Sequence, residues 1–193
     1  MRTPARSTWP EQIRALPICP RRKLPIPFSA ARRTEPEHDG RVVGDFTITD
    51  HDRVGRCAAE RLCGVCGLRL GYWIAFLGGP QSAESARGAY SDPPMHEECA
   101  EWALRLCPYI VSHRVPRRSD LIDPAGAAVA RPPGEDPAHP EAWVIAVTRS
   151  YKTFQSFDRA TRTPILLYRP QPASRLRRFE YRGERHELAE VTP

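Results

Sequence analysis

Two short stretches decide the fold of this protein: "RLCGVCGLRL" at residues 61–70 and "SDPPMHEECAEWALRLCPYI" at residues 91–110. The first contains a C-x-x-C pair and the second an H-x-x-C pair. Structural zinc is bound by four cysteine or histidine ligands at tetrahedral angles, and pairs of ligands separated by two residues are typical of such sites. The sequence therefore predicts one zinc ion, with the ligands Cys63, Cys66, His96 and Cys99.

The residues around each pair suit this geometry. Gly64 and Gly67 permit a sharp turn at the first pair, and Gly67 can take the positive φ that commonly follows the second thiolate. His96 and Cys99 stand three residues apart at the start of a predicted helix, so they share one face. The 29 residues between the pairs leave room for a β-hairpin. A knuckle, a hairpin and a ligand-bearing helix together predict a treble-clef-like zinc module.

We expect the zinc ion to be structural. Catalytic zinc keeps three protein ligands and one open position, whereas four ligands, three of them thiolates, would close this site. The chain has no H-E-x-x-H motif, no deaminase signature, no phosphate loop and no nucleophile elbow. Glu97 and Glu98 beside the histidine are explained as compensation of the helix dipole. The sequence thus argues against an enzyme without deciding the matter.

The remaining cysteines are predicted to be structural or incidental. Cys107 follows His96 by eleven residues, which is about 16 Å along a helix, too far to share one ion. Cys57 fits a small core position, and Cys19 has no partner in the sequence. Because the start of the chain has no apolar export signal and no run is long enough to span a membrane, we predict a cytoplasmic protein. Thiols stay reduced in that compartment, which favours metal over disulfides.

The net charge of +6 is concentrated at the two ends of the chain, and the region with the zinc motifs is mildly acidic. A predicted zinc helix with three glutamates and one arginine would repel phosphates. If the protein binds nucleic acid, the contacts should come from the basic runs "PRRK" and "SRLRRF". The candidate phosphate contacts are therefore Arg21, Arg22, Lys23, Arg175, Arg177 and Arg178.

The rest of the chain predicts an α+β fold. Residues 1–24 form a Pro/Arg-rich arm, residues 25–110 the zinc-binding core, residues 111–140 a Pro-rich connector, and residues 141–193 a C-terminal β element that packs on the core. Two strand-like runs joined by Asp39-Gly40 predict an N-terminal hairpin. A helix capped by Asp50 or Asp52 precedes the first cysteine pair, and Ser91 or Asp92 is expected to cap the zinc helix.

The C-terminal element is expected to be a small antiparallel sheet. Its three predicted strands are "AWVIAVTRS", "TPILLYRP" and "RLRRFEYRG", and the segment "YKTFQSFD" is expected to connect the first two. The prolines, 21 in 193 residues, predict interrupted strands and few long helices.

The segment "ERLCGVCGLRLGYWIAFLGGP…DPPMHEECAEWALRLCPYI" resembles a group of small, uncharacterised proteins from actinobacteria and their phages. Their shared pattern is C-x-x-C-G, an aromatic strand that ends in Gly-Pro, then P-P-x-H-x-x-C-A and C-P-[FY]-[LI]. The resemblance covers roughly residues 58–110 and implies a zinc-dependent fold with the same four ligands. It implies no activity, and the chain departs from the group between Pro80 and Pro93.

The sequence favours a zinc-stabilised binding or scaffold protein that engages a protein partner. A nucleic-acid-binding regulator is the first alternative, and an enzyme with a pocket between the zinc module and the C-terminal sheet is the second. A flat apolar patch near Trp9 or Trp143 would favour a protein partner. Arginines clustered on one face would favour nucleic acid, and a pocket with Cys107 or a perturbed histidine would favour an enzyme. The sequence names neither a partner nor an oligomeric state.

Overall fold

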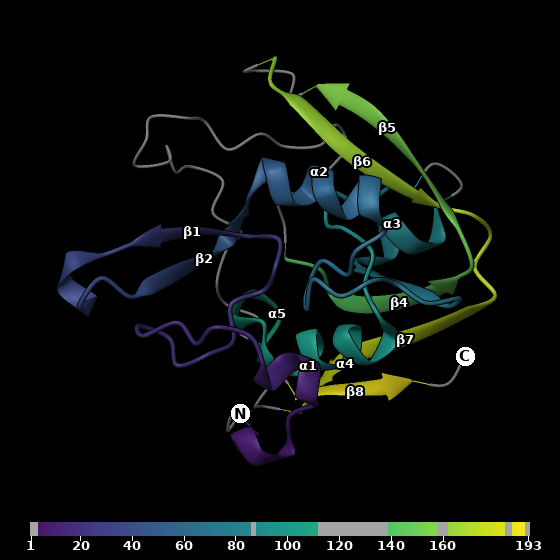
Figure 1. Ribbon diagram of the computed structural model, residues 1–193. Coiled ribbons are helices and arrows are strands. Elements are labelled where there is room, and N and C mark those ends of the chain that lie inside the picture. Colours follow the sequence, from purple (N-terminus) through teal and green to yellow (C-terminus); the bar gives the residue numbers. More distant parts are fainter. Residues whose placement is uncertain (1–3, 86–87, 112–138, 158–161, 184–186, 192–193) are drawn as a thin grey trace.

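The computed structural model describes residues 4–85, 88–111, 139–157, 162–183 and 187–191. It contains short helices and antiparallel sheets, which confirms the α+β class (Figure 1). The helices are α1 (Glu11–Arg14), α2 (His51–Glu60), α3 (Pro80–Glu84), α4 (Glu97–Leu106) and α5 (Pro108–Val111), with 3-10 turns at Arg6–Thr8 and Pro36–His38. The strands are β1 (Ala30–Thr34), β2 (Val42–Thr49), β3 (Ile74–Gly78), β4 (Ala142–Thr148), β5 (Tyr151–Phe157), β6 (Pro164–Pro170), β7 (Arg175–Arg182) and β8 (Glu187–Val191).

The predicted N-terminal hairpin is present as β1 and β2, which pair antiparallel and project from one side of the molecule (Figure 1). Asp39 and Gly40 in its connection both have positive φ, at 54° and 69°. Helix α2 follows directly, and the side chain of Asp50 caps it by accepting a 3.0 Å hydrogen bond from the Arg53 amide. These local predictions from turn and cap chemistry are therefore confirmed.

A four-stranded sheet with the order β3-β4-β7-β8 forms the centre of the molecule, and all its neighbouring strands are antiparallel. Strand β3 comes directly after the first cysteine pair, and its partner β4 comes from the C-terminal part of the chain. Ala75 pairs with Val147, and Leu77 with Ile145. The sheet that begins beside the cysteine pair is therefore continued by strands more than 60 residues later in the sequence.

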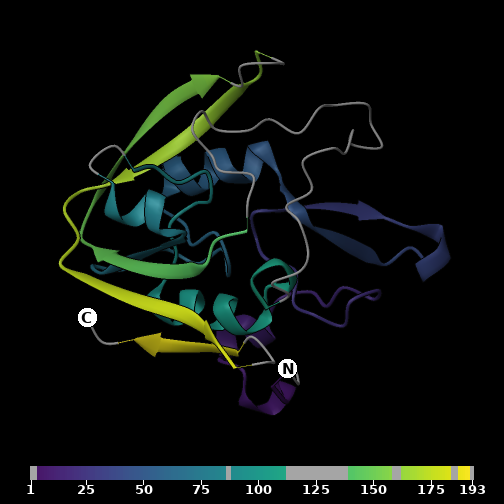
Figure 2. The ribbon, with the colours of Figure 1, turned by 180° about the vertical axis from the view of Figure 1, so that it is seen from behind.

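Each face of this sheet is covered by a different layer. On one face, Leu77 and Ile145 belong to a large apolar cluster that includes Ala100 and Leu104 of α4. On the other face, Phe76 and Ala146 pack with Val54 of α2 and with Tyr168 of β6, a second cluster that Tyr90 joins. Figure 2, which shows the molecule from behind, places the sheet between α4 on one side and α2 with β5 and β6 on the other. Strands β3 and β4 are thus buried on both faces, whereas β7 and β8 are partly exposed.

The C-terminal element differs from its prediction in two ways. Residues 151–157, expected to be a connection, form strand β5, which pairs with β6 in a separate two-stranded ribbon. Residues 187–191, for which no strand was predicted, form β8 at the sheet edge. The prediction was wrong at residues 151–157 because Tyr, Thr, Phe and Ser alternate there with charged and amide residues, a mixture that a solvated ribbon accepts as readily as a loop.

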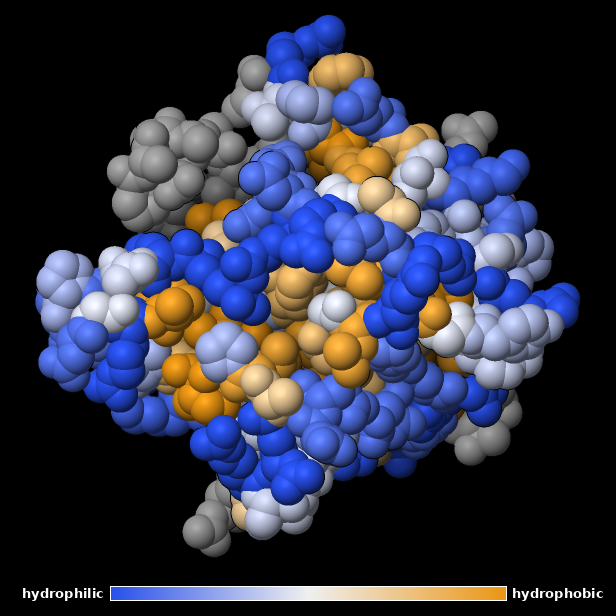
Figure 3. Space-filling model, in the orientation of Figure 1, coloured by the Kyte–Doolittle hydropathy of each residue, from blue (hydrophilic) through white to orange (hydrophobic). Residues whose placement is uncertain are grey.

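The N-terminal arm is anchored to the main core, because Trp9 and Ile13 are buried in the cluster with α4 and β4. The Pro-rich connector falls mostly at residues 112–138, outside the described residues. Within the described part of the chain, no helix is long and apolar enough to cross a membrane. Figure 3 shows apolar side chains gathered in the middle of the face seen in Figure 1, with hydrophilic residues around them.

Candidate metal centre

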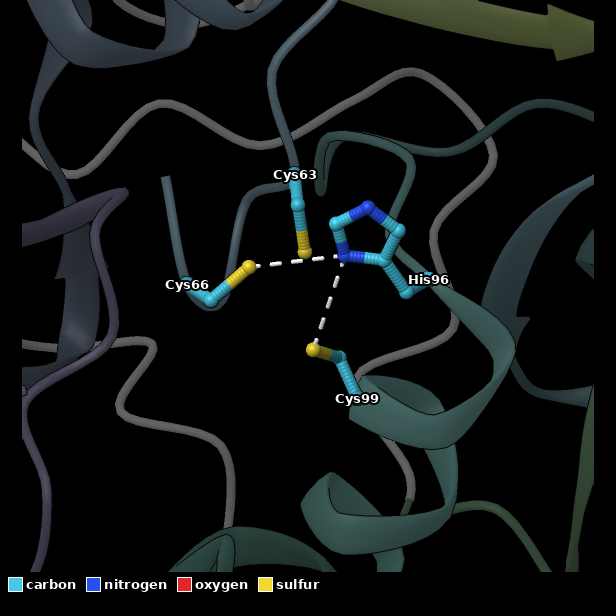
Figure 4. Close-up of side chains that lie close together, drawn as sticks. All are labelled: Cys63, Cys66, His96 and Cys99. Atoms are coloured by element: carbon cyan, nitrogen blue, oxygen red, sulfur yellow. Dashed lines mark hydrogen bonds between the residues drawn. The ribbon is translucent and has the colours of Figure 1, made fainter. Parts of the chain in front are cut away.

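Four side chains from two distant segments converge on one point in the structure. The sulfurs of three cysteines and one ring nitrogen of a histidine all lie within 4.8 Å of one another (Figure 4). Two of the cysteines are fully buried, and the third cysteine and the histidine are half-buried. The residues are Cys63, Cys66, His96 and Cys99, the same four that the sequence predicts as ligands of one ion. An arrangement of this size and composition could hold a metal ion.

The first pair is held by a tight turn. The Gly67 amide donates to the Cys63 carbonyl at 2.8 Å, and the Cys63 amide donates to the Leu68 carbonyl at 2.8 Å. Gly67 has a φ of +76°, as expected from the sequence. A Cβ atom at this position would lie 2.7 Å from Cδ2 of Phe28, so both the backbone conformation and the neighbour require glycine. The turn therefore directs both sulfurs to the same side.

The chain before β1 also holds this turn in place. The amides of Phe28 and Ser29 donate to the carbonyls of Val65 and Gly64, at 2.8 and 2.9 Å. These bonds satisfy two carbonyl groups of the turn and so stabilise its conformation. Backbone contacts of this kind have no side-chain signature, so they could not be predicted from the residues.

The second pair sits at the start of α4. His96 is the N-cap residue and Cys99 lies in the first turn, where free N–H groups favour a thiolate. No side chain caps this helix, so the predicted caps Ser91 and Asp92 are wrong. The reason is the position of Met95, which exchanges two backbone hydrogen bonds with Ala75 of β3, at 2.8 and 2.9 Å. This bridge keeps residue 95 extended and delays the helix until residue 97.

The ring of His96 is oriented by its second nitrogen. Nε2 lies 3.0 Å from the backbone carbonyl of Arg69. Because a carbonyl only accepts hydrogen bonds, Nε2 carries a hydrogen, and this bond turns Nδ1 toward the cysteines. Nδ1 lies 3.4 Å from the sulfur of Cys66 and 3.8 Å from that of Cys99 (Figure 4). Histidine ligands of metals are commonly fixed in this way.

Without a cation, the side chains of the cluster shift one another's pKa values. Burial opposes the charge of Cys63, but hydrogen bonds from Cys66, Cys99 and His96 outweigh it and lower the pKa of this thiol. Hydrogen bonds to Cys63 and Cys66, with burial, raise the pKa of Cys99. Hydrogen bonding to Cys63 raises the pKa of His96 to about 10. Without a metal, the four side chains therefore share protons through hydrogen bonds. A bound cation would displace these protons.

The other cysteines described by the structure lie outside this cluster. Cys57 is buried behind Cys63, and burial raises its pKa to about 12, which keeps it a neutral thiol. Cys19 is buried in a small cluster with Ile26 and Val43. Cys107 is the C-cap residue of α4. The sequence prediction that none of the three shares the site agrees with their positions.

A shallow pocket of about 300 Å³ lies between α4 and the strands β7 and β8. It occupies the place where the sequence located the pocket of an enzyme. Its lining consists of Glu101, Leu104, Arg105, Arg177, Phe179, Leu188 and Glu190. Neither a cysteine nor a histidine is among these residues, so this pocket does not contain Cys107 or a histidine, the residues whose presence would have favoured an enzyme.

The candidate phosphate contacts are mostly neutralised by carboxylates. Arg175 and Arg177 bind Glu97, at 2.6 and 3.0 Å, and Arg177 also binds Glu101 of α4. Arg178 pairs with Glu84 and Glu180, each at 2.9 Å, and Arg21 with Glu35 at 3.0 Å. Arg22 lies over the ring of Phe46. Lys23 has positive φ in a turn. Their role in phosphate binding stays a prediction.

Comparisons with protein-family models, with curated proteins and with solved structures give no match to this chain. The four-residue cluster is consistent with the metal-binding pattern on which the resemblance to actinobacterial and phage proteins rests.

Proposed function

We propose that the cluster is a closed structural zinc site and that the protein is a binding or scaffold protein stabilised by it. The observation that carries this proposal is the convergence of three thiols and one oriented imidazole within 4.8 Å. Soft sulfur ligands with one imidazole select zinc among the common divalent ions. Four protein ligands leave no position for a substrate or a reactive water, which argues for a structural ion.

We further propose a treble-clef-like arrangement for this module. Its first part is the turn between Cys63 and Cys66, closed by an antiparallel bridge between Leu62 and Arg69. Strand β3 and the bridge from Ala75 to Met95 supply an abbreviated hairpin, and α4 supplies the second pair of ligands. In this arrangement the ion joins two segments 30 residues apart and so contributes folding free energy directly.

A binding role fits the structure better than catalysis, because the pocket beside α4 is lined by paired charges and apolar groups. A protein partner stays a prediction from the sequence. Trp9 and Trp143, at which an apolar patch would have supported it, are only 5% and 7% exposed. A nucleic-acid partner gains support from a different observation, the distribution of unpaired cations that is described below.

Metal content and thermal melting test the structural site. We expect one zinc ion per chain, and a large loss of thermal stability when a chelator removes it, because the link between two segments 30 residues apart is then lost. A protein that melts at the same temperature with and without zinc would contradict the proposal. Cobalt substitution gives an independent readout, since thiolate ligands produce intense charge-transfer absorption in a tetrahedral site.

Substitution of one ligand provides the matched test. Cys63→Ser should abolish cooperative folding or lower the zinc content to near zero, because it leaves three ligands and a disordered turn. Cys107→Ser makes the same chemical change at a half-buried position outside the cluster and should retain zinc. Equal loss of zinc in both variants would mean that cysteine replacement acts on folding in general and not on the site.

A further inference from the structure

One surface of the molecule combines exposed aromatic rings with basic side chains. We call it the ribbon surface, and it consists of the two-stranded ribbon β5–β6 and the neighbouring ends of β3 and β4. The ends adjoin because Ser150 accepts a 2.9 Å backbone hydrogen bond from Gln171, just beyond β6. The ribbon projects at the top of Figure 1. Its aromatic and basic residues are Tyr72, Arg149, Lys152, Phe154, Phe157, Arg162 and Arg169.

Among the described residues, no carboxylate forms an ion pair with the cations of this surface. Within the part of the chain that the structure describes, Arg149, Lys152, Arg162 and Arg169 form no ion pair, in contrast to Arg175, Arg177 and Arg178. Residues 61–83, 142–157 and 162–178 contain no Asp or Glu, so the carboxylates that pair with Arg175, Arg177 and Arg178 come from other segments, which the fold brings close to them. Asp158, between two of these segments, lies outside the described residues.

One pair of these cations is unfavourable for the fold itself. Lys152 and Arg169 stand directly opposite each other across the ribbon. Like charges at directly opposed positions destabilise an antiparallel pair, and no described carboxylate relieves them. Both side chains are exposed, so these two cations are accessible to an external anion that would offset their repulsion.

Aromatic rings accompany the cations on both faces of the ribbon: Phe154 shares a face with Lys152 and Arg169, and Phe157 lies on the opposite face at the end of β5. The guanidinium of Arg169 lies 4.7 Å from the ring centroid of Phe154, and the guanidinium of Arg162 lies 5.9 Å from that of Phe157. Phe157 is 49% exposed. Arg149 lies 5.8 Å from the ring of Tyr72 and donates a 2.8 Å hydrogen bond to its hydroxyl. Figure 3 shows hydrophilic and apolar residues side by side at the top of the molecule, where the ribbon lies.

We propose that the ribbon surface binds single-stranded nucleic acid. Cations without a carboxylate partner among the described residues attract the phosphates, and aromatic rings next to them offer stacking platforms for unpaired bases. A seven-residue strand spans about 24 Å, long enough for several nucleotides. An acidic protein segment would use the charges but not the exposed ring faces, so the observations favour the nucleic acid. The proposal rests on the proposed binding role and does not depend on the identity of the metal.

Fluorescence anisotropy with the full-length, zinc-loaded protein tests this proposal. The probe is a labelled oligothymidylate of about 12 nucleotides, within the range that such surfaces cover. We compare the wild type with the double variant Lys152→Ala/Arg169→Ala and with Phe157→Ala. The control Arg41→Ala/Arg105→Ala removes two exposed cations from the β1–β2 connection and from α4. Each protein's zinc content and melting temperature are measured first.

We expect salt-sensitive binding by the wild type and by the control. The double variant should lower the slope of log affinity against log salt by about 1.4, which corresponds to two phosphate contacts on a single strand. Its melting temperature should not fall, since the opposed cations are removed. Phe157→Ala should weaken binding about fivefold or more through lost stacking. The zinc measurements separate these results from a failure of the structural site.

Several outcomes would overturn the proposal. A folded, zinc-loaded wild type that shows no binding at low salt would remove it, as would equal weakening of the control and the double variant. Displacement of the oligonucleotide by polyglutamate at equal charge concentration would assign the surface to an acidic protein. Duplex DNA that binds as tightly as the single strand, with no effect of Phe157→Ala, would restrict the contacts to phosphates.

Discussion

At the scale of single residues, the metal centre depends on positions where only one residue type fits. Gly67 is the clearest case, because its φ is +76° and the ring of Phe28 occupies the space of a Cβ atom. The turn places Cys63 and Cys66 on the same side, so a change at this glycine acts on the ligands without touching them. The positive φ was predicted from the C-x-x-C-G pattern, whereas the contact with Phe28 became known only from the structure.

We predict that Gly67→Ala destabilises the protein by about 2–5 kcal/mol. The estimate combines the cost of a left-handed conformation, about 1–2 kcal/mol, with that of overpacking against Phe28, about 1–3 kcal/mol. Chemical denaturation of the zinc-loaded protein measures it. Gly71→Ala is the matched control, because Gly71 has open space around it and no positive φ, and its stability should stay within about 0.5 kcal/mol of the wild type. Equal effects of both changes would contradict this account.

At the scale of elements, ion pairs connect α4 to the sheet. Arg177 of β7 binds Glu97 and Glu101 of α4 on one side and Glu190 of β8 on the other. Its side chain is only 20% exposed, so these pairs are less screened than ordinary surface pairs. Hydrogen bonding to Glu190 raises the pKa of Arg177. Arg177 belongs to the basic run for which phosphate contacts were predicted. In the structure this side chain holds α4 against the sheet.

The same contact predicts a pH dependence. The hydrogen bond from Arg177 lowers the pKa of Glu190 below its ordinary value of 4.5. A carboxylate whose pKa is lower in the folded state adds stability above the unfolded value, and this stability is lost as the pH falls through the lowered pKa. Glu190→Gln should therefore reduce stability at neutral pH and make the loss of stability below about pH 4.5 less steep.

Denaturation at a series of pH values measures this difference between Glu190→Gln and the wild type. Acid also releases zinc, but it does so in both proteins, so the difference between them isolates the carboxylate. Glu187→Gln on the same strand is the control, because Glu187 forms no ion pair within the described residues. Parallel pH curves for the wild type and Glu190→Gln would show that the pair contributes nothing to stability.

At the scale of the whole molecule, the two halves of the chain share one core. Strand β3, which follows the first cysteine pair, is buried between β4, α4 and the second cluster around Phe76 and Tyr168. Ile74 and Ala75 have no exposed surface at all. The predicted boundary at residue 110 therefore falls between strands of a single sheet. The segment that carries the four candidate ligands packs against strands from the C-terminal half.

We predict that a fragment of residues 1–111 does not fold cooperatively, even with zinc. Without β4, the ladder partner of β3 is missing and its apolar residues face water. Circular dichroism melting and zinc content of the fragment measure this. As a control, a protease site inserted within residues 112–138 of the full chain should leave both pieces associated after cleavage. A cooperative melt of the fragment alone, with one bound zinc, would show that the zinc module is independent.

The candidate ligands and the local elements could be predicted because their signals are short-range. C-x-x-C and H-x-x-C spacing, a glycine suited to positive φ and an aspartate before a helix each act over a few residues. The predicted caps of α4 failed because a long-range bridge from Met95 to Ala75 competes with them. Strand β5 was missed because its pairing with β6, and not its composition, makes it a strand.

Spacing and turn chemistry alone were sufficient to indicate the four converging side chains, the N-terminal hairpin and the α+β class, since each depends on contacts between near neighbours or on ligand chemistry. Tertiary structure decided which arginines are paired. Arg177 is close in sequence to other cations but lies against Glu97 and Glu101, whereas Lys152 and Arg169, 17 residues apart, meet across the ribbon without a carboxylate. Charge balance depends on distances in space, and those distances are set by strand pairing and packing that no single segment encodes.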